Sequence, residues 1–374
     1  MPAPIFYVAA PIGDRTGGPE ALALLVDSMR KKGVEAYLIP MRNFRGRMQH
    51  PEYGKFDAPI VPAMPNHPDG HLVIGEVSPI ESRSELSRTP DSHVWMLWLS
   101  VNNSPIPKAR YYKATEGACS MFPAGSDSKV PAELWPHDDQ EITEGPMRTW
   151  REARRRKGKA ITQIAPSVIE TVSIRYAESL MKRDINFGTQ SYYGQSFLQS
   201  AYRRGSFLLT DYPQSAAPVQ VERERNVVSY NGTKGKWKID HLRRRLPGVE
   251  FVPIENMTFD QVRETLARSA LYVEIGSLPG RDRLPREAAN QGTPTIMLAR
   301  GAGYCWQDFP IGEKYRFPYT LDWADHMAPV ISDTLQDPEE IHATQAEFQE
   351  WVAGEPARYD QALEAWLERA HRGP

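Results

Sequence analysis

The sequence predicts an α/β protein built from two Rossmann-like halves. Near the N-terminus, an apolar run at 5–10 is followed by a helical pattern and a second apolar run at 35–40, which together make a βαβ unit of ordinary size. A segment of linker composition lies at 213–221. Beyond it, strand-like and helix-like stretches alternate again. Two separate alternations predict two parallel sheets.

The first half continues the opening βαβ unit. Pro19 opens a helix that runs to about Lys32, and Gly33 ends it. Further strands are predicted at 71–77, 93–100, 160–165, 186–191 and 206–211, and helices at 166–182 and 191–203. The stretch 102–158 is rich in Pro, Gly and charge, which indicates an irregular insertion. We therefore expect one domain over residues 1–215.

The second half alternates more regularly. Strands are predicted at 226–231, 250–253, 271–275 and 293–298, and helices at 236–246, 258–269 and 285–291. These elements predict a second domain over residues 220–345. The tail from Asp337 has a helical pattern with Phe348, Trp351, Leu363 and Trp366 as apolar anchors. We expect residues 346–374 to form a helix that returns to the first domain.

Composition narrows the class of protein. The 374 residues carry a formal charge of −2 and two cysteines. Bulk charge therefore draws the chain neither to nucleic acid nor to anionic lipid, and a disulfide framework is not expected. The N-terminus lacks a basic segment followed by an apolar core, and no apolar run approaches the ~18–20 residues of a spanning helix. A cytoplasmic protein without a transmembrane segment is the expectation.

The segment 271–298 is the most informative part of the chain. A predicted strand leads into a Gly-Ser-Leu-Pro-Gly loop carrying Arg281 and Arg283, and Pro285 opens a short helix that contains Glu287. Loops at the carboxyl ends of parallel strands are where open α/β sheets bind ligands. Cations and backbone N–H groups at a helix N-terminus suit phosphate, and a carboxylate one turn further on can reach a sugar hydroxyl. These groups together suggest a nucleotide.

Two other loops have related features. The loop 13–20 places Gly17 and Gly18 before Pro19 at a predicted helix N-terminus, although its spacing is not that of a dinucleotide fingerprint. An ordinary tight turn is the alternative. The loop 231–236 places Lys234 and Lys236 after a predicted strand, within reach of a diphosphate. Solvated lysines are the alternative there. Glu287 likewise has a structural alternative, because an acid in the first turn of a helix is favourable in itself.

The run Glu287-Ala-Ala-x-x-Gly-Thr-Pro294 resembles the donor-binding signature of GT-B glycosyltransferases, nucleotide-sugar enzymes with two Rossmann domains. The loops 231–236 and 16–18 are similar to the phosphate-binding loop of the donor domain and the Gly-rich loop of the acceptor domain. The segments 279–288, 95–103 and 190–193 resemble a bacterial subgroup of this class. The resemblance implies a GT-B fold, an enzyme that transfers a hexosyl or pentosyl group, and a donor ribose bound by Glu287.

The residue patterns and the resemblance together give the candidate site residues. The diphosphate leaving group would be stabilised by an electrostatic clamp of Lys234, Lys236, Arg281 and Arg283, with Asp14 as a candidate for a catalytic base. The donor-binding candidates are Gly17, Gly18, Asn231, Lys236, Pro279, Gly280, Arg286 and Glu287. The acceptor-binding candidates are Asn102, Asn103, Arg154 and Arg155. One departure concerns Gly280, because many members have a second Glu at that position.

Neither a metal nor a cofactor is implied. The acidic pairs Asp138-Asp139 and Asp322-x-x-Asp325 do not end predicted strands, and the nine histidines show no ligand spacing. The expected function is metal-independent transfer of a sugar from a nucleoside diphosphate sugar, such as a UDP-sugar, to a hydroxyl of a carbohydrate, lipid-linked or nucleic-acid acceptor. The basic run 151–159 is expected to be a solvated helix end or loop, and a phosphate-bearing acceptor is its alternative reading. One alternative function is therefore a transferase acting on nucleic acid through this run. A non-catalytic sugar-nucleotide-binding protein is the other.

Overall fold

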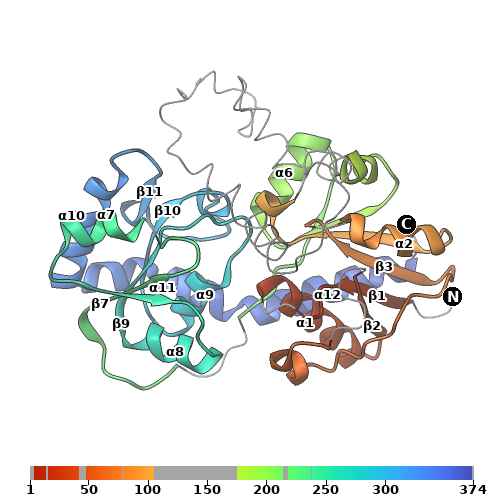
Figure 1. Cartoon of the computed structure of the whole chain (residues 1–374), viewed down its shortest axis with the longest axis horizontal. Coiled ribbons are helices and arrows are strands. Elements are labelled where there is room, and N and C mark those ends of the chain that lie inside the picture. Colours follow the sequence, from red (N-terminus) through yellow and green to blue (C-terminus); the bar gives the residue numbers. More distant parts are fainter. Residues whose placement is uncertain are drawn as a thin grey trace, which may run out of the picture.

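The computed structural model describes residues 4–13, 16–41, 48–77, 79–104, 175–213, 218–236 and 238–372. These residues form two parallel sheets with helices packed around them, one sheet in each half of the chain (Figure 1). Two Rossmann-like domains are therefore present, as the alternation of strands and helices predicts.

The N-terminal sheet has the order β2-β1-β3-β4-β5-β6, and all neighbouring strands are parallel. The strands are β1 (Ile5–Ala10), β2 (Glu35–Pro40), β3 (Gly70–Gly75), β4 (His93–Trp98), β5 (Asn186–Thr189) and β6 (Phe207–Leu208). The chain order reverses between β1 and β3, so the switch point of this sheet lies there.

Helices of this half include α1 (Gly17–Lys31), α2 (Arg83–Arg88) and α6 (Tyr192–Tyr202), with 3₁₀ turns η2 (Pro51–Lys55), η3 (Pro79–Ser82) and η4 (Val101–Asn103). Residues 175–181 are also helical. Strand β4 is shorter than predicted because the buried carboxylate of Glu76 accepts the N–H groups of Leu99 (3.0 Å) and Ser100 (2.8 Å), which takes them out of the ladder. Strand β5 ends early because Ser191 caps α6. The predicted strand 160–165 lies outside the described residues.

The C-terminal sheet has the order β11-β10-β9-β7-β8, again with parallel neighbours. The strands are β7 (Glu224–Asn231), β8 (Glu250–Ile254), β9 (Ser269–Glu274), β10 (Thr295–Ala299) and β11 (Arg316–Pro318). The edge strand β11 was not predicted, because its three residues are too short for a periodic pattern. The switch point lies between β7 and β9.

Helices of this half are α7 (Ile239–Arg245), α8 (Phe259–Arg268), α9 (Arg283–Asn290), α10 (Trp323–Gln336) and α11 (Glu339–Ala353), with 3₁₀ turns η6 (Ala302–Tyr304) and η7 (Glu313–Tyr315). Helix α8 begins where predicted because Thr258 and Gln261 form a capping box. Helix α9 begins at Arg283, two residues before Pro285.

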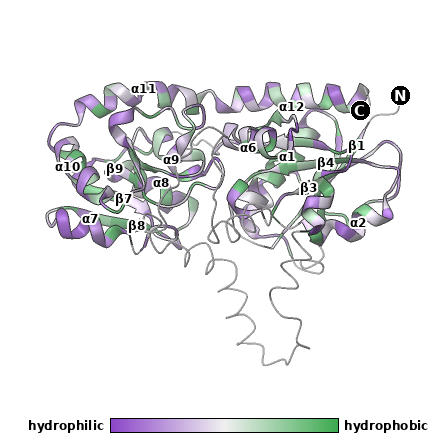
Figure 2. Ribbon diagram, turned by 90° about the horizontal axis from the view of Figure 1, so that it is seen from above, coloured by the Kyte–Doolittle hydropathy of each residue, from purple (hydrophilic) through white to green (hydrophobic). Residues whose placement is uncertain are grey.

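The chain returns to the first domain through α12 (Glu355–Arg372). Figure 2 shows α11 along one half and α12 along the other. Phe348 of α11 is buried in the C-terminal core. Trp366 of α12 is buried in the N-terminal core, where its ring contacts those of Trp95 (5.3 Å between centroids) and Phe207 (4.9 Å). The returning helix therefore starts at Glu355, whereas residues 346–353 complete α11.

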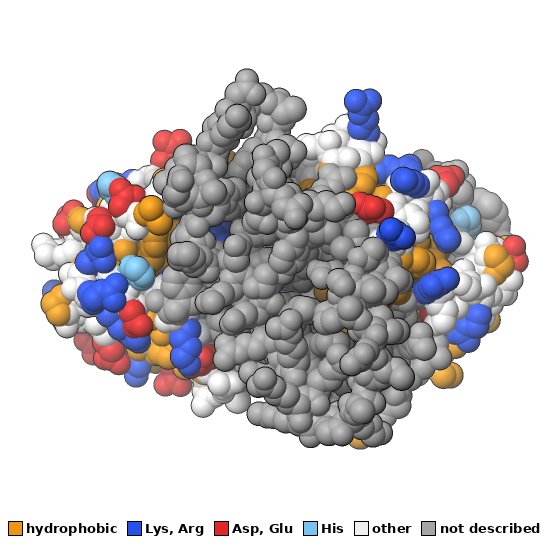
Figure 3. All heavy atoms as spheres, turned by 45° about the horizontal axis from the view of Figure 1, so that its top comes forward, with side chains coloured by type: hydrophobic (Ala, Val, Ile, Leu, Met, Phe, Trp, Pro, Cys, Tyr) orange, Lys and Arg blue, Asp and Glu red, His pale blue; other side chains and the backbone are white. Residues whose placement is uncertain are grey.

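The surface and the helices add two observations. On the face seen in Figure 3, Lys and Arg side chains of the described residues are interspersed with Asp and Glu, in keeping with the formal charge of −2. Within the described ranges, we find no helix with the length and apolarity needed to cross a membrane.

A buried histidine makes the stability of the N-terminal domain sensitive to pH. His71 of β3 is 3% exposed and its Nδ1 accepts a hydrogen bond of 2.8 Å from Trp95. Burial, aided by the charges of His93 and His371, lowers the pKa of His71 to about 4. The unfolded chain, with a pKa near ~6.5, therefore binds the proton more readily. We expect His71 to reduce the free energy of unfolding by about 3 kcal/mol as the pH falls from 7 to 4.

Urea unfolding of the wild type and of His71→Gln at several pH values measures this contribution. The wild type should lose more stability than the variant between pH 6.5 and pH 4. Parallel pH profiles for the two proteins would contradict the prediction.

Candidate functional site

The switch points bring polar loops to the carboxyl ends of the two sheets. In the C-terminal sheet, the loops after β7 and β9 are in contact, since a Cβ placed on Gly276 would lie 2.6 Å from Cβ of Lys234. The loop after β9 leads directly to the N-terminus of α9. Open α/β sheets bind ligands at such a point.

Lys234 lies beside the N-terminus of α9. The loop 231–236 is held in place by the side chain of Asn231, because Oδ1 of Asn231 accepts hydrogen bonds from the N–H groups of Thr233 and Lys234, both at 3.1 Å. The ammonium group forms an ion pair with Asp282, the residue that precedes α9. The Lys234 side chain is 34% exposed. The structure therefore brings Lys234 and α9 together, as the resemblance implies.

Lys236 lies apart from this group. Its ammonium group is 3.2 Å from the carboxylate of Glu255, which follows the edge strand β8. The Lys236 side chain is 73% exposed. Of the two lysines in the loop, Lys234 is thus the one beside α9.

Arg283, the first residue of α9, connects the two domains. Its Nε and Nη2 atoms donate to Oδ2 of Asp211 at 3.0 and 2.8 Å, and its Nη1 lies 2.5 Å from Oε2 of Glu20. Both acids belong to the N-terminal half. Burial alone would lower the pKa of Arg283, but the charges of Asp211 and Glu20 outweigh it and raise the pKa above its ordinary value.

Arg286 is fully buried, and all five of its N–H donors are engaged. They bond to the main-chain oxygens of Asp282, Asp211 and Arg281 and to the carboxylates of Asp211 (3.0 Å) and Glu355 (3.0 Å). Arg286 therefore has no free N–H left for the predicted contact with the donor. Its hydrogen bonds instead join segments of the two halves of the chain. The charges of Arg286 and Arg283 overcome the effect of burial and hold the pKa of Asp211 at about 2.

Arg281 is 3% exposed. Its Nε donates to the main-chain oxygen of Asp308 at 3.0 Å, and its guanidinium lies 2.7 Å from the carboxylate of Glu355. The carboxylate of Asp308 in turn accepts the N–H groups of Tyr192 (2.8 Å) and Tyr193 (2.9 Å) at the start of α6. Arg281 thus belongs to the contact between domains, which the prediction of a phosphate contact did not anticipate.

Glu287 differs in its contacts from the acids Asp211, Glu20 and Glu355. It lies one helical turn after Arg283 and is partly buried. No hydrogen bond or ion pair of its carboxylate is found among the residues that the structure describes. Burial raises the pKa of Glu287, and the nearby charge of Arg283 opposes this effect. Its acceptor oxygens are therefore available to a hydroxyl ligand.

The glycine loop of the first domain faces α9. Gly17 and Gly18 form the first residues of α1, and a Cβ placed on Gly17 would lie 4.0 Å from Nε of Arg283. The Thr16 side chain does not cap the helix. Instead, the Tyr53 hydroxyl holds the main chain of Thr16, accepting from its N–H (3.1 Å) and donating to its oxygen (3.0 Å). The N-termini of α1 and α9 therefore converge across the two domains.

The loop before α9 packs tightly on the first domain. A Cβ placed on Gly280 would lie 2.0 Å from the main-chain oxygen of Leu99, and both Pro279 and Gly280 are buried. This contact explains why a glycine replaces the second Glu of many GT-B enzymes. Asn102 lies nearby, where a Cβ placed on Gly301 would be 3.3 Å from its Nδ2, and its Oδ1 accepts a hydrogen bond of 2.7 Å from the Tyr193 hydroxyl.

Of the four predicted site residues that remain, the structure describes only Asn103. Asn103 is exposed at the end of η4. Asp14, Arg154 and Arg155 lie outside the described residues, as does most of the predicted insertion.

Several acids of the site were not singled out from the sequence. Glu274, fully buried at the end of β9, accepts hydrogen bonds from the Tyr272 hydroxyl (2.7 Å) and the Gly276 N–H (2.8 Å). Burial raises its pKa, and the charge of Lys234 opposes the rise. The alternation of Tyr272 and Glu274 on one face of a strand was the available signal. For Glu20, Asp211 and Glu355, no local pattern indicates a partner in the other domain.

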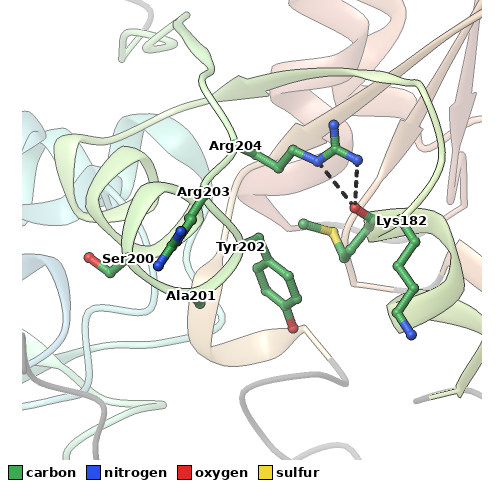
Figure 4. Close-up of a pocket in the computed structure, with 7 residues that line it drawn as sticks. Lys182, Ser200, Ala201, Tyr202, Arg203 and Arg204 are labelled. Carbon is green, nitrogen blue, oxygen red and sulfur yellow. Dashed lines mark hydrogen bonds between the residues drawn. The ribbon is translucent and has the colours of Figure 1, made fainter.

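A separate cavity of about 550 Å³ lies near the C-terminal end of α6 (Figure 4). Residues that line it include Lys182, Tyr202, Arg203 and Arg204. The Arg204 guanidinium donates to the main-chain oxygens of Met181 and Arg183, each at 3.1 Å. Since α6 starts at the carboxyl end of β5, its C-terminal end is remote from the switch points, and we do not assign this cavity to the candidate site.

The GT-B fold has two Rossmann-like domains, each with a parallel sheet, that meet at the carboxyl ends of their strands. A helix returns from the second domain to the first. Comparison with solved structures supports this assignment of the fold. A sucrose-phosphate synthase from Thermosynechococcus elongatus superposes with a TM-score of 0.61 at 12% identity, over 99% of this chain and 98% of that one. Anabaena HepE in complex with UDP gives 0.55 at 9% identity, over 98% and 100%. LpCGTa in complex with UDP gives 0.55 at 11% identity, over 99% and 100%.

The protein has the GT-B fold, which it shares with these structures. No protein-family model matches the sequence, and no curated protein sequence matches it significantly.

Proposed function

We propose that the protein is a glycosyltransferase that moves a sugar from a nucleoside diphosphate sugar to a hydroxyl acceptor. One observation carries the proposal: Lys234 and the open carboxylate of Glu287 flank the N-terminus of α9 at the switch point, opposite the glycines that begin α1. A cation and a helix N-terminus suit phosphate, and a carboxylate suits the ribose hydroxyls. Two of the similar structures contain UDP, which favours a UDP-sugar as donor.

In this proposal, Lys234 neutralises the charge that develops on the diphosphate leaving group, and no metal or cofactor takes part. Glu287 accepts hydrogen bonds from the ribose hydroxyls and so fixes the position of the sugar. The N–H groups of Gly17 and Gly18 approach the donor from the other domain. Closure of the domains excludes water, which limits hydrolysis of the donor.

A sugar-nucleotide-binding protein without transferase activity is the second candidate. The observation in its favour is that Lys234, Arg281, Arg283 and Arg286 each already pair with a carboxylate. Release of UDP from UDP-sugars, measured with and without a panel of acceptors, separates the two candidates. Donor binding without transfer or hydrolysis would favour the second.

Glu287→Gln tests the ribose contact. Because a hydrogen bond to a charged group contributes about 1.5–3 kcal/mol, the variant should bind UDP at least ~10-fold more weakly in calorimetry. Glu264→Gln, an exposed position on α8, is the matched control and should bind UDP like the wild type. Equal affinities of all three proteins would remove Glu287 from the site.

A further inference from the structure

A carboxylate from the first domain occupies one arm of Arg283. Nε and Nη2 of Arg283 are taken by Asp211, and Nη1 is taken by Glu20 at 2.5 Å. Glu20 lies in the first turn of α1, two residues after Gly18. The Glu20 carboxylate therefore lies where the N-termini of α1 and α9 converge, which is where an anionic ligand would be favoured.

Glu20 also has a second cationic partner, within its own domain. Its Oε1 is 2.8 Å from the ammonium group of Lys55 at the end of η2. The Lys55 ammonium also lies 5.4 Å from the centre of the Phe259 ring, the first residue of α8. Glu20 can thus release Arg283 and still keep an ion pair, and Arg283 can release Glu20 and still keep Asp211. The contact between Glu20 and Arg283 is the exchangeable one.

The charges around Arg283 give this contact a consequence for ligand binding. Glu20, Asp211 and Glu287 all lie close enough to Arg283 to interact with its charge. Among these acids, Asp211 is fixed by Arg286 and Gln190, and Glu287 stands one turn along the same helix. A diphosphate that binds beside these acids adds further negative charge. It needs a hydrogen-bonding N–H group that is not already bonded to a carboxylate.

We propose that Glu20 is an internal anion that holds Nη1 of Arg283 in the ligand-free protein and yields it to the diphosphate of the donor. This inference rests on the proposed function, and it adds that Glu20 sets the affinity of the site for diphosphate. Glu20 then opposes diphosphate binding, and Lys55 favours it by retaining the displaced carboxylate.

Calorimetry with pyrophosphate, UDP and uridine tests the proposal on the full chain. Glu20→Gln should bind pyrophosphate and UDP about tenfold more tightly than the wild type, since the neutral amide competes less well for a guanidinium. Uridine, which lacks phosphate, should bind both proteins equally. Lys55→Met should have the opposite effect and weaken UDP binding roughly threefold, because Glu20 then depends on Arg283 alone.

Glu364→Gln is the matched control. It removes an exposed acid of α12 that pairs with Lys32 at the C-terminal end of α1, the end opposite to Glu20, and its UDP affinity should equal that of the wild type. If the wild type binds UDP but Glu20→Gln binds it no more tightly, the role of Glu20 is refuted while the proposed function stands. If neither protein binds UDP or pyrophosphate, the proposed function fails, and the role of Glu20 fails with it.

Discussion

Replacing Arg286 with methionine should lower the free energy of unfolding by about 3–5 kcal/mol. The side chain is fully buried, and its guanidinium is bonded to the carboxylates of Asp211 and Glu355. Its removal takes one of two cationic partners from each of two buried acids, since Asp211 keeps Arg283 and Glu355 keeps Arg281, and this costs more than the lost hydrogen bonds alone. Chemical unfolding of the variant and the wild type, followed by circular dichroism, measures the difference.

The matched control is Arg243→Met, which removes an exposed ion pair with Asp240 and should change stability by less than about 1 kcal/mol. Equal unfolding midpoints for Arg286→Met and Arg243→Met would show that the buried network contributes little.

Lys234→Ala should reduce the rate of sugar transfer by about 100-fold, which corresponds to ~2.7 kcal/mol of transition-state stabilisation. The reason is that the leaving diphosphate gains negative charge in the transition state, and Lys234 is the partly exposed cation beside α9. The loss should appear mainly in kcat, because an interaction that strengthens in the transition state affects kcat more than substrate binding. Release of UDP from a UDP-sugar in the presence of acceptor is the assay.

Lys236→Ala is the internal control for this experiment. It removes the same charge from the same loop, but its ammonium group pairs with Glu255 on the side of β8. We expect its rate to stay within about threefold of the wild type, as an exposed ion pair contributes little. If the two variants lose the same activity, the loop acts through its overall charge, and the specific role of Lys234 is wrong.

The fold could be predicted from the sequence largely because its signals are local. The strands 5–10 and 35–40 appear with the predicted bounds, and the capping box at Thr258 fixes the start of α8. The C-terminal sheet has the βα alternation that the sequence predicts. In each case, the residues that determine the element lie within it or directly beside it.

The partners of the site residues could not be predicted in the same way. The sequence shows Arg281, Arg283 and Arg286 as three cations in one loop and helix, which favours a phosphate site. The structure pairs them with Asp211 and Glu355, and with Glu20, which come from distant parts of the chain. Arginines that bind phosphate and arginines that join two domains have the same local pattern, because only the partner distinguishes them. Lys234 and Glu287 come closest to what the resemblance implies.

Arg286 also has a mechanical consequence. Asp211 is near the end of the first domain's described residues, Glu355 begins the helix that returns to that domain, and Arg286 bonds to both residues. Any rotation of one domain against the other that preserves these bonds must pivot near this guanidinium. Residues far from this pivot are displaced most for a given rotation angle, so labels on α7 and α2 would report a rigid-body rotation most sensitively.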